Sequence, residues 1–189
     1  MANKLKTLSH IVVTTSGIAL NGERLETTGN GLDMLTNAYR SYVNDYPKFF
    51  KMDGLGKLGF LASELLLKSL HEERFISRDD RAVILLGSSG SRDADIHFQS
   101  TISDKDNFFP SPSVFVYTLP NIVTGEIAIR NKYLGETAFY VISHYDESLI
   151  KQLLMAAFQD DATKSVLTGW VDYADKEHFE AKLKLINRT

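Results

Sequence analysis

Serine and histidine stand side by side in this sequence where a predicted strand meets a predicted helix. Ser143 and His144 follow the apolar run 137–142 and precede an amphipathic segment that begins near 147. Such a junction brings side chains together and points free backbone N–H groups outward. A serine hydroxyl becomes a nucleophile only when a base takes its proton, and adjacent side chains need not face each other. The structural alternative is a polar loop in which Asp146 caps the helix.

A second small-residue loop, Gly87-Ser88-Ser89-Gly90-Ser91, follows an apolar run and invites comparison with phosphate-binding and serine-nucleophile motifs. It lacks the Lys-Ser/Thr ending of a P-loop and the three spaced glycines of a dinucleotide fingerprint. Ser91 also stands where a nucleophile elbow needs glycine. Small residues equally suit a tight turn at the end of a strand, so we interpret this loop as structural.

The remaining polar residues predict no metal site and no other cofactor. The sequence contains no cysteine, which excludes a disulfide, a thiolate ligand and a cysteine nucleophile. The acidic pairs 79–80 and 160–161 are interpreted as solvated surface. Five histidines are present, but none has the spacing that would hold zinc with a neighbouring carboxylate; they are His10, His71, His97, His144 and His178.

The composition is that of an ordinary soluble globular protein. The 189 residues are 43% hydrophobic and 24% charged, with a net charge of −3, and we predict a single domain over residues 1–189. The basic residues are scattered, which argues against a nucleic acid or an anionic membrane as partner. No apolar run approaches the ~20 residues of a membrane span, and no signal peptide is recognisable. We therefore expect a cytoplasmic protein.

Short β-rich runs alternate with amphipathic helical patterns, which predicts an α/β architecture. The continuous apolar run 82–86 is typical of a central strand covered on both faces, and the alternation at 179–185 predicts a strand with one wet face, paired antiparallel with the strand before it. We expect turns between Gly17 and Gly31 and an extended segment leading into 114–118. The other predicted strands are 8–15, 137–142 and 165–171, and the predicted helices are 32–42, 55–70, 120–135 and about 147–158.

The order of these pieces resembles the N-terminal half of a β-ketoacyl synthase, a condensing enzyme of the thiolase-like fold. The resemblance implies a mixed β-sheet with helices on both faces. The most specific match is a Pro-Asn helix that runs to a Leu-Gly turn before the strand that carries the nucleophile in the family. The segments that carry the resemblance are Ile11–Ile18, Lys51–Asp53 with the helix 55–70, Ala82–Gly90, Leu119–Ala128 with Tyr133–Gly135, and Val166–Val171.

The sequence departs from the family at the residue that does the chemistry. In a working synthase, the turn after the strand 137–142 carries a cysteine whose thiolate accepts the acyl chain. Ser143 and His144 occupy this position here, and the family's two catalytic histidines come from a second half that the chain does not reach. The resemblance therefore implies a non-catalytic partner subunit in fatty-acid, polyketide or aryl-polyene-type synthesis. The alternative is an acyltransferase or hydrolase that acts on acyl thioesters through Ser143 or His144.

The resemblance also implies an oligomer. In the family two similar halves pack their central helices together, so a lone half would present an apolar layer, here the stripe 149–158 or the helix 55–70. The partner would be a second copy of the chain or a complete ketosynthase. The family also dimerises through the strand before the nucleophile, here 137–142, by antiparallel pairing.

An acyl carrier protein is a further expected partner. It is acidic and needs basic residues to dock, and Lys48, Lys51 and Lys57 form the nearest approach to a basic group. Several aromatic residues could line an acyl channel, although we expect most of them to pack in the core: Tyr46, Phe49, Phe50, Phe108 and Phe109.

Overall fold

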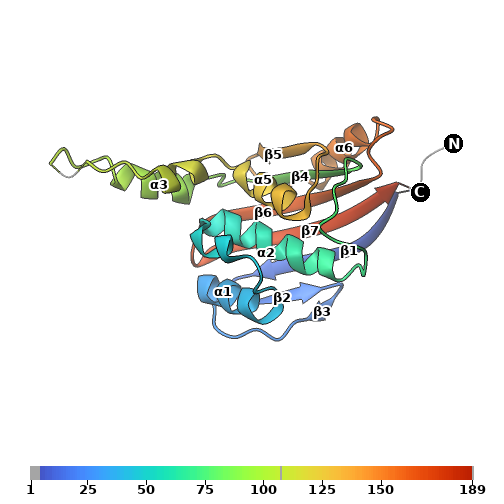
Figure 1. The fold of residues 1–189 in the computed structure, drawn as a ribbon, viewed down its shortest axis with the longest axis horizontal. Coiled ribbons are helices and arrows are strands. Elements are labelled where there is room, and N and C mark those ends of the chain that lie inside the picture. Colours follow the sequence, from blue (N-terminus) through green and yellow to red (C-terminus); the bar gives the residue numbers. More distant parts are fainter. Residues whose placement is uncertain (1–4, 107, 189) are drawn as a thin grey trace.

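The computed structural model describes residues 5–106 and 108–188 and contains a seven-stranded mixed sheet (Figure 1). The strand order is β3-β2-β1-β7-β6-β4-β5. Strand β4 pairs in parallel with β5 and β6, and all other neighbours are antiparallel. The strands are β1 (Leu5–Thr14), β2 (Gly17–Leu20), β3 (Glu23–Arg24), β4 (Arg81–Gly87), β5 (Thr137–Val141), β6 (Ser165–Asp175) and β7 (His178–Arg188).

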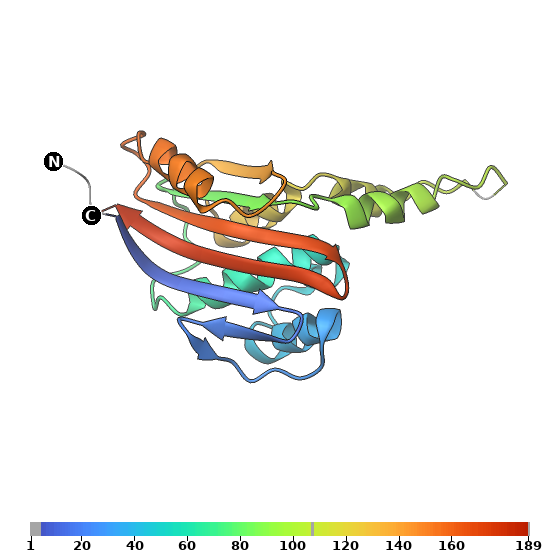
Figure 2. The same ribbon diagram turned by 180° about the vertical axis from the view of Figure 1, so that it is seen from behind.

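Helices cover both faces of this sheet, which confirms the predicted architecture. Helices α1, α2 and α5 lie on one face, and α6 lies on the other, over β4 and β6 (Figures 1 and 2). The α-helices are α1 (Gly31–Tyr42), α2 (Gly54–Lys68), α3 (Arg92–Ser100), α4 (Pro112–Phe115), α5 (Ile122–Asn131) and α6 (Glu147–Ala157), and two short 3-10 helices are η1 (Pro47–Lys51) and η2 (Val116–Thr118).

Helix α2 is the centre of the main core. Asp53 starts it by accepting a hydrogen bond from the amide of Gly56 at 2.8 Å. The helix is buried from Gly54 to Leu67, because the sheet, α1 and α5 surround it. Gly59 permits the close approach of α5, since a Cβ there would lie 2.5 Å from a methyl of Val123. The prediction that this helix leaves an uncovered apolar layer is therefore wrong.

Two strand predictions are confirmed by burial and register. All seven residues of β4 are buried, as expected of a central strand. On β7, Ala181, Leu183 and Leu185 point into the core with α2, whereas Lys182 and Lys184 are half-buried on the opposite face. Strand β7 pairs antiparallel with β6 over almost its whole length.

The structure differs from the sequence prediction mainly between 92 and 135. Helix α3 lies in a stretch for which the sequence analysis gives no element, because its apolar residues Ala94, Ile96 and Phe98 alternate and do not follow helical spacing. Pro112 begins the helix α4 instead of prolonging an extended segment, since proline fits the first turn of a helix. Helix α5 ends at Asn131, four residues before the predicted end at 135, and Lys132 terminates it in the left-handed conformation (φ 57°).

The strands β2 and β3 were also missed. They pair within the segment 17–31, for which we expected only turns. They are four and two residues long at the edge of the sheet, too short to show a period of two.

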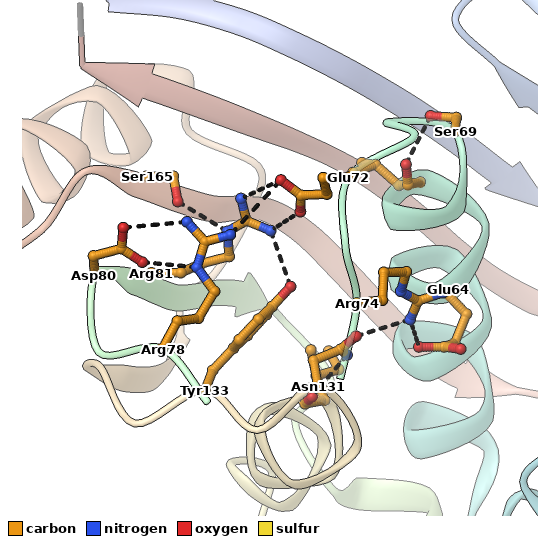
Figure 3. Close-up of polar contacts among 12 residues, drawn as sticks. Glu64, Ser69, Glu72, Arg74, Arg78, Asp80, Arg81, Asn131, Tyr133 and Ser165 are labelled. Atoms are coloured by element: carbon orange, nitrogen blue, oxygen red, sulfur yellow. Dashed lines mark hydrogen bonds and ion pairs between the residues drawn. The ribbon is translucent and has the colours of Figure 1, made fainter. Parts of the chain in front are cut away.

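A buried polar cluster fixes the segment between α2 and β4 (Figure 3). Arg81, which is 1% exposed, forms a bidentate ion pair with Glu72 and donates to the hydroxyls of Tyr133 at 3.0 Å and Ser165 at 2.8 Å. Glu64 pairs with Arg74, which also donates to Asn131 at 2.8 Å. Since its groups bond mainly to one another, we interpret the cluster as a structural clamp.

Residues 92–118 form an arm that projects beyond the sheet (Figure 1). Helix α3 packs there against α4 and η2, and Phe98 lies 5.2 Å from Phe115 between ring centroids. The hydroxyl of Ser91 donates to the carbonyl of Thr118 and joins the two ends of the arm at its root.

Candidate functional site

The structure brings Ser143 and His144 together at the carboxyl end of β5. The Ser143 hydroxyl lies 2.8 Å from Nδ1 of His144, a hydrogen-bond distance. Asp146 caps α6 by accepting from the amides of Ser148 at 2.8 Å and Leu149 at 3.0 Å, as predicted. The helix cap and the serine–histidine contact therefore coexist in one turn.

This pair lacks the surroundings that activate a serine. Ser143 and His144 are both exposed, and in the described residues no carboxylate or carbonyl accepts a hydrogen bond from the His144 ring. Neither residue lines any of the five best-formed cavities in the described part of the chain. A serine nucleophile needs a base, a third group that orients the base, and a site that excludes water. Of these, the described residues supply only the contact of Ser143 with a base, His144.

The side chain of Asp172, on β6, occupies the loop after β4. Asp172 accepts hydrogen bonds from the amides of Ser88 at 2.8 Å and Ser89 at 2.7 Å, and its second oxygen accepts from the Ser88 hydroxyl at 2.9 Å. A carboxylate thus occupies the amides that a phosphate would need. The geometry supports the structural interpretation of this loop.

A cavity of about 310 Å³ with charged and apolar lining residues lies between the start of α2 and the root of the arm. Its wall includes Lys51, Asp53 and Lys57 from the segment around the α2 N-terminus, and Asp93 and His97 from α3. Burial raises the pKa of the Asp53 carboxyl to about 6, although the bond from the Gly56 amide opposes this. Burial also lowers the pKa of Lys57. Both shifts report on groups that are largely withdrawn from water.

The raised pKa of Asp53 predicts a specific pH dependence of stability. Below about pH 4 the Asp53 carboxyl is protonated in both the folded and the unfolded protein. Its contribution to the free energy of unfolding is lost as the pH rises through about 6. The reason is that burial in the folded protein disfavours the ionised carboxylate. The loss at neutral pH is at most about 3 kcal/mol. We expect Asp53→Asn, which keeps a capping side chain, to be more stable than the unchanged protein at pH 7.5 and to differ less at pH 5. Urea unfolding at both values measures this, and an equal difference at the two pH values would contradict it.

The three lysines expected to bind a carrier protein have different surroundings. Lys48 is engaged in an ion pair with the buried Glu126 at 2.7 Å, whereas Lys51 and Lys57 line the cavity described above. Among the aromatic residues, Phe49 is fully buried and stacks on Tyr39 with 3.9 Å between ring centroids. Tyr46 stacks on Phe60 in the same core.

Three of the five aromatic residues named in the sequence analysis are exposed. Phe108 and Phe109 are 56% and 74% exposed on the arm, and Phe50 is 47% exposed beside Tyr39. The prediction that most of the five pack in the core is thus wrong, because only Phe49 and Tyr46 do so. The exposure of Phe108 and Phe109 could not be read from the sequence, because it depends on the arm's projecting from the sheet.

Two further findings concern the described residues only. In 5–106 and 108–188 no group of three or more histidines and carboxylates is close enough to hold a metal ion. In the same residues no helix is long and apolar enough to cross a membrane.

The sheet order, the helices on both faces and the strand–turn–helix unit at 137–157 define the thiolase-like ketosynthase fold. The structure of the ishigamide ketosynthase/chain length factor matches 98% of this chain with a TM-score of 0.68 and 16% identity. A ketosynthase in complex with its chain length factor from Xenorhabdus doucetiae matches 98% of the chain with a TM-score of 0.60 and 12% identity. A β-ketoacyl synthase from Burkholderia phymatum matches 99% with a TM-score of 0.62 and 13% identity.

The chain therefore has a ketosynthase-like fold. It spans 62%, 79% and 59% of those three chains, in the same order. No protein-family model matches the sequence, and no curated protein is significantly similar to it. The fold is thus established by the structure.

Proposed function

We propose that this protein is a non-catalytic, ketosynthase-like subunit that assembles with a second copy of itself or with a complete ketosynthase. The observation that carries the proposal is an exposed apolar surface, called here the arm–β5 surface. Half of the large apolar side chains that are exposed in the described residues belong to it: Ile96, Phe108, Phe109, Phe115, Val116, Leu119, Tyr140 and Val141.

Strand β5 ends beside the root of the arm. It is the edge strand of the sheet, so one side of its backbone has no partner strand among residues 5–106 and 108–188. Val141 at its end lies beside Gly90 at the root of the arm, since a Cβ on Gly90 would be 3.3 Å from a Val141 methyl. A free strand edge next to an exposed apolar patch is typical of an association surface. This favours the antiparallel pairing through 137–142 that the family resemblance implies.

The proposed surface differs from the apolar layer expected from the sequence. Helix α2 is covered by its own chain, and α6 turns Ile150, Leu154 and Ala157 toward its own sheet. Met155 is the one large apolar side chain of α6 that is strongly exposed, at 56%. The arm–β5 surface is therefore the better candidate for the contact.

The non-catalytic part of the proposal rests on the missing thiol and on the open position of Ser143 and His144. The sequence has no cysteine to accept an acyl group, and the serine–histidine pair is open to water. The similar structures contain chain length factors by their own descriptions, which supports a role beside a ketosynthase in polyketide or aryl-polyene-type synthesis. Fatty-acid synthesis, an acyl carrier protein as partner and a cytoplasmic location belong to the same proposal.

Acyl transfer to the protein tests the catalytic alternative. We expect no covalent adduct, by intact-mass measurement, when the protein is incubated with acyl thioesters of a carrier protein or of coenzyme A. The hydrogen bond between Ser143 and His144 is the one observation in favour of an enzyme. An adduct that forms on the unchanged protein and is lost in both Ser143→Ala and His144→Ala would overturn the non-catalytic proposal. Ser148→Ala, which changes an exposed serine at the start of α6, is the matched control.

A further inference from the structure

The face of the sheet that carries α6 also holds a mainly apolar cavity. Figure 2 shows this face, on which α6 covers one side of the sheet while β7 and β1 run past it uncovered. A groove of about 390 Å³ lies between α6 and these strands. It shares no lining residue with the arm–β5 surface, so it is independent of the assembly proposed above.

The walls of this groove are apolar. Ile150 and Leu154 of α6 and Ile186 of β7 form its inner part and are less than 10% exposed. Leu5 of β1 and Met155 of α6 stand at its opening. A concave site of this size with apolar walls is typical of small-molecule binding.

One buried polar residue lies in the lining of the groove. Thr168 lies on β6 opposite Lys184 of β7 and is 1% exposed. Its hydroxyl gives the otherwise apolar inner wall a group that can donate a hydrogen bond to a ligand or accept one from it.

Positive charge surrounds the opening. Lys151, Lys182 and Lys184 line the groove, and their side chains are 71%, 42% and 45% exposed, so their ammonium groups reach solvent. Glu147 lies 3.8 Å from Lys151 and 3.9 Å from Lys184, distances that leave both ammonium groups weakly held. Lys182 is paired with Glu180 at 2.9 Å, so Lys151 and Lys184 are the weakly held positive charges that favour an anionic ligand.

We propose that this groove binds a small amphipathic carboxylate, with its apolar chain against α6 and its carboxylate at Lys184. The volume sets the size of the ligand. At about 30 Å³ for each water-sized group, the groove holds roughly a dozen heavy atoms, which is the size of decanoate. Tyr145, at the end of the groove, places its ring against Trp170 with 5.9 Å between centroids and contacts Lys182 through a cation–π interaction.

Titration of the full chain with decanoate below its micelle concentration tests the site by calorimetry. We expect saturable binding at one site per chain and a simultaneous change in the fluorescence of Trp170, the only tryptophan. Decanol has the same chain without the charge, so it should bind about tenfold more weakly, as should decanoate to Lys184→Gln. Absence of saturable binding, or equal affinities for decanoate and decanol, would overturn the proposal.

Two matched variants locate the ligand. Met155→Glu places a carboxylate on the wall of the groove, and Leu134→Glu makes the same change at a residue that is 72% exposed outside it. Both positions tolerate a polar side chain because both are largely in water. We expect binding of decanoate to be lost in Met155→Glu and retained in Leu134→Glu. Equal affinities in the two variants would show that decanoate binds elsewhere and would overturn the assignment.

Discussion

Phe109→Asp combined with Val141→Asp is expected to separate the assembled protein into single chains. Phe109 is 74% exposed on the arm and Val141 is 56% exposed on β5, so neither substitution removes a core contact. Both would place a carboxylate in an apolar contact, where burial without a partner costs several kcal/mol. We expect the dissociation constant to rise about a hundredfold or more. Size-exclusion chromatography with light scattering measures the change in mass.

The control for this variant is a double substitution outside the arm–β5 surface. Ile129 and Leu134 are 66% and 72% exposed, and Ile129→Asp with Leu134→Asp adds the same charge to the chain. We expect this control to keep the mass of the unchanged protein. Circular dichroism should show that both proteins are folded. Dissociation of the control to the same extent, or retention of the assembly by the arm–β5 variant, would show that the contact lies elsewhere.

The second large effect is expected on stability, from Arg81→Met. Arg81 is buried at the start of β4, where it donates hydrogen bonds to Glu72, Tyr133 and Ser165 (Figure 3). Methionine fills part of the volume but leaves the Glu72 carboxylate, whose side chain is 28% exposed, without its main partner. Removal of one member of a buried ion pair costs about 3 kcal/mol or more. Urea unfolding should therefore show a loss of about 3 kcal/mol.

Arg78→Met provides the comparison. Arg78 pairs with Asp80 at 2.7 Å, and both side chains are partly exposed, at 24% and 34%. Such a pair contributes about 1 kcal/mol or less. We therefore expect Arg78→Met to lose much less stability than Arg81→Met. A similar loss in both variants would mean that the cluster does not act as a clamp on the segment between α2 and β4.

The elements that bury apolar residues could be predicted from the sequence. The run 82–86 and the helix 55–70 carry clear patterns, and β4 and α2 lie where these patterns indicate. Asp146 could also be assigned as the cap of α6, because a capping side chain bonds to amides only two or three residues away. These predictions depend on local contacts.

The arm and the groove could not be predicted in this way. Helix α3 buries one residue and projects from the sheet, so its sequence has no apolar stripe that marks a helix. The sequence alone assigns Phe108 and Phe109 to the core, because it does not show that the arm projects from the sheet. Lys184 and Thr168 lie sixteen positions apart and meet only because β6 and β7 pair in register. The contact of Ser143 with His144 depends on side-chain rotamers, which the sequence does not specify.

Light scattering of the unchanged protein over a wide dilution range tests the proposed assembly without any substitution. We expect a species with the mass of two chains that dissociates only at high dilution, because the arm–β5 surface is apolar and ends on a free strand edge. A folded protein with the mass of one chain at every concentration, which also forms no complex with a ketosynthase, would contradict the proposal that this is an assembling subunit.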